Sequence, residues 1–151
     1  MALLAKGTWV LLADGEKALI CENTGTPRAP RLRLHAKMAQ EVIANRDQVT
    51  DRPGRMPDPG HNQRSAMEAT DHARISKEQF AADVAERLNR LAGKVDIDRL
   101  VVVAAPQILS VLRDRIDPDL RARVMAELPK TLTQHPLSQL GGKVAELIDR
   151  L

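Results

Sequence analysis

The sequence has almost no aromatic residues: Trp9 and Phe80 are the only two, and tyrosine is absent. Proteins that bind single-stranded nucleic acid without sequence preference stack the bases on aromatic side chains, so this scarcity excludes an aromatic stacking surface. It also means that the hydrophobic core has to be built from leucine, valine, isoleucine, alanine and methionine.

Cysteine is nearly absent as well. Cys21 is the single cysteine in 151 residues, which excludes an internal disulfide and a cysteine-based metal cluster. No apolar run is long enough to cross a membrane, and the amino terminus is too short and too weakly apolar for a signal peptide. We therefore expect a cytoplasmic protein without a membrane span.

The charge of the chain is modest. A formal net charge of +3 permits a phosphate-bearing partner without requiring one. The length of 151 residues suits one domain with a hydrophobic core of its own, so we expect a single domain over residues 1–151.

The most apolar stretch of the chain is LVVVA at residues 100–104, where three β-branched residues follow one another. Because polar residues do not alternate along it, both of its faces should be covered, as in a central strand with helices packed on the sheet. Pro106 then ends the strand and suits the first turn of a helix. A buried helix from Leu100 onward is the alternative, which the valines and the proline disfavour.

The remaining patterns predict strands and helices that together make an α/β domain, a mixed sheet with helices packed on it. Ser76 and Gln79 match a capping box, which predicts a helix that begins at Ser76 and is closed by Gly93. Gly141 and Gly142 lie inside a further predicted helix and indicate a kink or a close approach. The other expected elements are an antiparallel meander at residues 8–13, 17–22 and 31–35, a helical turn after Asp117, a strand from Val124 and a helix opening at Pro136.

Regular periodicity disappears between about residues 45 and 75, where prolines and glycines interrupt the pattern. Long loops of this kind tend to be functional or disordered. Arginines suit bidentate contacts with phosphate, and glycines let a backbone approach a ligand closely. Solvation alone also collects polar residues in loops, so both interpretations stay open. The candidate binding residues of this loop are Arg52, Gly54, Arg55, Gly60, Gln63, Arg64, Ser65 and Glu68.

Metal and cofactor chemistry finds little support in the sequence. His61 and His72 lie near Asp58 and Glu68, but their spacing matches no metal-ligand signature. There is no phosphate-binding glycine motif. We expect neither a metal nor a cofactor.

The order of segments resembles the bacterial host-attachment protein family. DRPGR at residues 51–55, Gly60 and RSAME at 64–68 resemble the loop signature of that family. WVLLAD at 9–14 resembles its opening hairpin, and RLVVVAAP at 99–106 its central strand. The resemblance covers nearly the whole chain. It extends to the middle domain of archaeal and eukaryotic peptide-chain release factors, which implies an RNase H-like α/β fold.

In that release-factor domain a long loop between a strand and a helix carries a Gly-Gly-Gln tip, whose glutamine positions water against the peptidyl-tRNA ester. The corresponding tip here is Gly60-His61-Asn62-Gln63, which lacks the doubled glycine, so the resemblance does not carry peptide release over. It implies instead a host-attachment-type binding module, without established catalysis, that acts through an arginine-rich loop.

The alternative is a release- or rescue-like factor bound to the ribosome, to tRNA or to other structured RNA, with Gln63 acting in peptidyl-tRNA ester hydrolysis if there is any catalysis. A third interpretation is a metal-dependent nuclease on an RNase H-like scaffold. It is disfavoured because the apolar strands lack the carboxylate cluster that a two-metal site needs.

Overall fold

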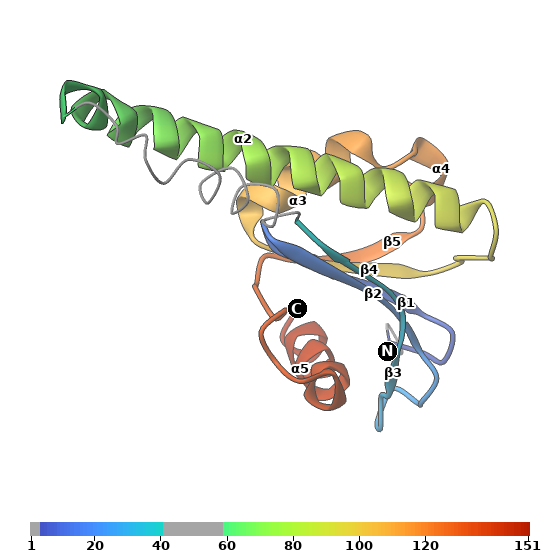
Figure 1. Ribbon diagram of the computed structural model, residues 1–151. Coiled ribbons are helices and arrows are strands. Elements are labelled where there is room, and N and C mark those ends of the chain that lie inside the picture. The colour runs from blue at the N-terminus through green and yellow to red at the C-terminus, as the bar shows by residue number, and fades with distance from the viewer. Residues whose placement is uncertain (1–3, 41–58) are drawn as a thin grey trace.

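The computed structural model describes the backbone of residues 4–40 and 59–151, and the side chains of residues 4–40 and 74–151. A five-stranded sheet of order β3-β2-β1-β4-β5 forms its centre (Figure 1). Its strands are β1 (Trp9–Ala13), β2 (Lys17–Asn23), β3 (Leu32–Ala39), β4 (Leu100–Ala104) and β5 (Val124–Leu128).

The centre of the sheet is formed by β1 and β4. β1 pairs antiparallel with β2 and parallel with β4, so that Leu11 lies opposite Ile20 on one side and Val102 on the other. Every residue of both strands is buried. The prediction that residues 100–104 form a central strand covered on both faces is therefore confirmed.

Helices cover both faces of this sheet (Figure 1). One face carries α2 (Pro59–Ala92), α3 (Pro106–Arg115) and α4 (Pro118–Arg121), and the other carries α5 (Leu137–Asp149). The core is accordingly double. Leu11, Phe80 and Leu88 belong to the layer beneath α2, whereas Leu12 and Val144 belong to the layer beneath α5. No helix in the described part of the chain is long and apolar enough to cross a membrane.

The beginning of α2 corrects two predictions. Residues 59–75 are helical and not loop, and Ser76 lies inside the helix instead of capping it. The physical reason is that no proline or glycine occurs between Gly60 and Gly93, so a helix nucleated in the packed half propagates without a break. Residues 41–58 of the predicted loop lie outside the described residues.

The edge strand β3 also differs from its prediction. It was expected at residues 31–35 and extends from Leu32 to Ala39, with a register shift opposite the Ile20–Cys21 step of β2. Polar and apolar residues alternate from Arg31 to Met38, so the observed strand continues the same pattern beyond the predicted range.

Candidate functional site

The amino-terminal half of α2 leaves the body of the protein. Among the side chains of α2 that the structure describes, from Arg74 onward, burial begins at Phe80 and continues to Leu88, whereas Ile75 is 55% exposed. Figure 1 shows the helix before that point projecting beyond the sheet. We call residues 59–75 the arm. At 1.5 Å of rise per residue the arm is about 24 Å long.

Two loops hold α2 where the arm begins. The backbone N–H of Gln40, directly after β3, donates to the carbonyl oxygen of Glu16 at 2.7 Å, and its side-chain Nε2 donates to the carbonyl oxygen of Ser76 at 3.2 Å. Gly15, in the β1–β2 turn, lies so close to Lys77 that a Cβ there would collide with the lysine side chain. The direction in which the arm leaves the body is therefore set by the end of β3 and by the β1–β2 turn.

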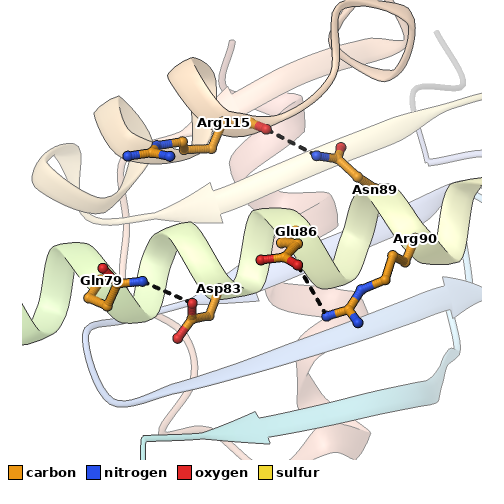
Figure 2. Close-up of polar contacts among 6 residues, drawn as sticks. All are labelled: Gln79, Asp83, Glu86, Asn89, Arg90 and Arg115. Atoms are coloured by element: carbon orange, nitrogen blue, oxygen red, sulfur yellow. Dashed lines mark hydrogen bonds and ion pairs between the residues drawn. The ribbon is translucent and has the colours of Figure 1, made fainter.

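A cavity of about 510 Å³ lies at the base of the arm. Among its described lining residues the carboxylate is that of Asp83, which accepts a hydrogen bond from Gln79 Nε2 at 3.1 Å (Figure 2). Polar groups of this kind can bind a polar ligand. The lining residues are Met38, Ala39, Gln40, Ile75, Ser76, Gln79, Phe80 and Asp83.

The other end of α2 is fixed to the turn between α3 and α4. Asn89 Nδ2 donates to the carbonyl oxygen of Arg115 at 3.0 Å (Figure 2), and Asn89 Oδ1 accepts from the backbone N–H of Asp117 at 2.9 Å. Glu86 and Arg90 form an ion pair at 3.8 Å. Both side chains are exposed to solvent, so the pair contributes little to stability. α2 is therefore a single helix held at residues 76–77 and at residue 89. The arm precedes both of these contacts in the chain.

The structure brings five of the eight predicted binding residues together on the arm. They share the first turns of α2, whereas Arg52, Gly54 and Arg55 lie outside the described residues. The segment as a whole is not positively charged, because residues 41–75 contain five arginines and six carboxylates. The five residues on the arm are Gly60, Gln63, Arg64, Ser65 and Glu68.

A comparison with protein families gives the chain a place among known proteins. The model of bacterial archaeo-eukaryotic release factor family 12 matches residues 7–144. The chain belongs to this family. The match confirms the resemblance to the release-factor domain that the loop and strand motifs indicate. A comparison with curated proteins found no match.

One polar site of this family 12 protein was not predicted from the sequence. Asp14, at the end of β1, accepts hydrogen bonds at Oδ1 from the backbone N–H of Glu16 at 2.6 Å and of Lys17 at 2.7 Å. Its Oδ2 accepts from the hydroxyl of Thr133, which is buried. Burial opposes ionisation of this carboxyl, but the hydrogen bonds outweigh it, so the pKa of Asp14 is below its ordinary value. The site joins the β1–β2 turn to the segment before α5.

The single thiol of the family 12 protein, on Cys21, lies inside the sheet. Cys21 is buried in β2, and burial raises the pKa of its thiol to about 11, which keeps it protonated at neutral pH. In the described part of the chain, no three His, Cys, Asp or Glu side chains come together as metal ligands.

Proposed function

We propose that this family 12 protein is a cytoplasmic factor that binds the ribosome or tRNA and presents the arm to it. One observation carries the proposal: the first half of α2 stands clear of the body (Figure 1). The arm lies between β3 and the packed part of α2, and this is the place in chain order where the release-factor domain carries its Gly-Gly-Gln loop.

The arm suits this role because its helix continues into the core. Most of the stability of a helix in a protein comes from tertiary packing and not from intrinsic propensity. Here the packed half, from Phe80 onward, supplies the nucleus, and the contacts at Ser76 and Lys77 set the direction. The arm therefore carries Gln63 to a fixed place about 20 Å from its base.

Within this proposal the arm binds and does not catalyse. The tip keeps Gln63 and a single glycine, Gly60, instead of a doubled glycine before the glutamine. We assign Gln63, with Ser65 and Glu68, to hydrogen bonds with the partner. We assign Arg52, Arg55 and Arg64 to its phosphates, since guanidinium groups match phosphate oxygens bidentately. Gly54 and Gly60 would allow close approach of the backbone.

The family match favours a release-factor-like role over host attachment, because the description of the matching family names release factors. We also propose that the body is one RNase H-like domain over residues 1–151. A mixed five-stranded sheet with helices on both faces supports that proposal.

The test is co-sedimentation of the full chain with bacterial ribosomes. Replacing the three assigned arginines with alanine should lower the bound fraction at least about fivefold, since each contact to a charged group contributes about 1.5–3 kcal/mol. A matched control removes two exposed cations from the packed half of α2 and one from the turn that follows it, and should bind like the wild type. The test variant is Arg52→Ala, Arg55→Ala, Arg64→Ala, and the control is Arg87→Ala, Arg90→Ala, Lys94→Ala.

Two results would contradict this assignment. If both triple variants lose ribosome binding equally, the effect belongs to net charge and not to the three assigned arginines. If the wild type hydrolyses peptidyl-tRNA on the ribosome and Gln63→Ala does not, the arm is catalytic and the assignment of Gln63 to binding alone is wrong.

A further inference from the structure

One segment of the chain carries cations without any carboxylate. Residues 24–40 contain four lysines and arginines and no aspartate or glutamate, whereas the other 19 basic residues of the chain stand against 20 acidic ones. This segment therefore accounts for the whole positive excess of the protein. We call its five exposed basic and imidazole side chains the basic rim: Arg28, Arg31, Arg33, His35 and Lys37.

The basic rim follows one margin of the sheet. Within the described residues β3 is an edge strand that pairs with β2 alone, and the only carboxylate of β2 is Glu22, opposite Arg33. His35 contacts the ring of Trp9, in the layer beneath α2, at 4.8 Å between centroids. Lys37 lies opposite Leu19, which belongs to the layer beneath α5. The side chains of the basic rim therefore flank the margin on both faces, over about 20 Å from Arg31 to Lys37.

The loop that begins the rim is organised by Asn23, a fully buried side chain. Asn23 Nδ2 donates to the carbonyl oxygen of Leu4 at 2.7 Å, and its Oδ1 accepts from the backbone N–H of Gly25 at 3.0 Å and of Arg31 at 2.9 Å. The carbonyl oxygen of Arg31 in turn accepts from the N–H of Thr24 at 2.9 Å. Both backbone polar groups of Arg31 are thereby fixed.

Close contacts on both sides keep this loop in place. A Cβ on Gly25 would lie 2.8 Å from the backbone nitrogen of Arg31, so the loop closes tightly on itself. A Cβ on Gly141 of α5 would lie 2.8 Å from the carbonyl oxygen of Pro30, so α5 lies directly against the loop. The guanidinium groups at positions 28 and 31 are thus presented from an ordered backbone, which lowers the ordering cost of binding.

We infer that the basic rim binds the sugar–phosphate backbone of double-helical RNA. Three of its four permanent cations are arginines, which contact phosphate oxygens bidentately. Duplex RNA is recognised by shape and backbone, whereas single strands need aromatic platforms. Trp9 is buried and Phe80 lies in the core, so the described surface provides no such platform.

A polyanion fits this margin better than an added strand from an acidic protein. The register shift and Lys37 are features that keep edge strands from pairing with other chains. The inference rests on the proposed function, which it deepens. Because residues 41–75 are charge-balanced, the rim supplies the long-range attraction to RNA, and the arm makes a separate contact.

The test is the fluorescence anisotropy of a labelled RNA duplex of about 20 base pairs, titrated with the full chain between about 50 and 200 mM salt. Removing the four rim cations should weaken binding at least about tenfold and reduce the slope of log K against log salt by about 3. Removing four exposed cations elsewhere should change affinity less than about threefold. The rim variant is Arg28→Ala, Arg31→Ala, Arg33→Ala, Lys37→Ala, and the control is Lys94→Ala, Arg99→Ala, Lys130→Ala, Arg150→Ala.

Three results would overturn the inference. One is an equal loss of duplex binding in both variants, which would be an effect of net charge. Another is rim-dependent binding of polyglutamate with no binding of the duplex, which would assign the rim to an acidic protein. The third is wild-type duplex affinity in the rim variant. If the variant without Arg52, Arg55 and Arg64 then still loses ribosome binding, the proposed function stands and only the rim inference fails.

Discussion

Asn89, on the packed half of α2, donates a hydrogen bond to the carbonyl oxygen of Arg115 at the end of α3. The same amide accepts from the N–H of Asp117, so a single side chain joins α2 to both ends of the α3–α4 turn. Because the turn leaves these two backbone groups without helical partners, Asn89 completes their hydrogen bonding.

Replacing Asn89 with alanine should lower the free energy of unfolding by about 1–2 kcal/mol, because two hydrogen bonds are lost. The higher helix propensity of alanine offsets this loss by only a few tenths of a kcal/mol. Urea unfolding followed by circular dichroism measures this. Glu86→Ala, which removes only the exposed pair with Arg90, should change stability by less than about 0.5 kcal/mol. Equal effects in the two variants would contradict the role assigned to Asn89.

The two adjacent glycines of α5 should respond to alanine in opposite directions. At Gly141 a Cβ would meet the carbonyl oxygen of Pro30 at 2.8 Å, and we expect destabilisation by about 1–3 kcal/mol. At Gly142 nothing lies within 4 Å of an added Cβ, so the higher helix propensity of alanine should stabilise by about 0.5–1 kcal/mol. Thermal unfolding of both variants decides the matter, and a stabilised Gly141→Ala would show that the contact with Pro30 is not close.

Acid should weaken the fold in part through Asp14. A carboxyl whose pKa is lower in the folded than in the unfolded state stabilises the fold above its unfolded pKa, and this stability is lost as pH falls through the folded pKa. For Asp14 the loss should begin near the ordinary value of 3.8 and continue below it. The unfolding free energy of Asp14→Asn should therefore fall less on acidification than that of the wild type.

Thr133→Val tests the cause of this pKa shift. It removes the hydroxyl that donates to Asp14 Oδ2 and leaves the two backbone donors in place. We expect an acid dependence between those of the wild type and Asp14→Asn, measured by urea unfolding across the acidic range. A profile identical to the wild type would mean that Thr133 does not lower the pKa of Asp14.

A proline inside the arm should disrupt its helix, and with it ribosome binding, without changing the stability of the rest of the protein. Ala69→Pro removes a backbone donor and clashes within the helix, at a local cost of about 3 kcal/mol. If the arm acts as proposed, ribosome co-sedimentation should fall strongly, with Ala69→Ser binding like the wild type. The urea midpoint should stay close to the wild type, because the buried residues among the described side chains of α2, from Arg74 onward, begin at Phe80. Unchanged ribosome binding by Ala69→Pro would count against a rigid arm.

The central strand could be predicted from the sequence because burial on both faces leaves a direct signature. Residues 100–104 have no polar alternation, and the structure buries all five. The packed half of α2 was predicted for the same reason, since Phe80, Val84 and Leu88 repeat at helical spacing.

The arm could not be predicted in the same way. Helical periodicity in a sequence reflects packing on one face, and a helix that leaves the body has no face to mark. The Asp14–Thr133 contact escaped prediction for a different reason: its partners are 119 positions apart, and no local pattern joins them. The sequence predicts the region in which the eight candidate binding residues lie. The structure places five of them on one helix.

Because the arm and the packed half of α2 are one helix, a change in the length of the arm also rotates its tip around the helix axis. A single inserted residue between Gly60 and Ser76 would advance the tip by about 1.5 Å and swing it by about 100° around the axis. Insertions or deletions of about seven residues, which make two full turns, would restore the direction of Gln63 around the helix axis. We therefore expect relatives with longer or shorter arms to differ by whole turns.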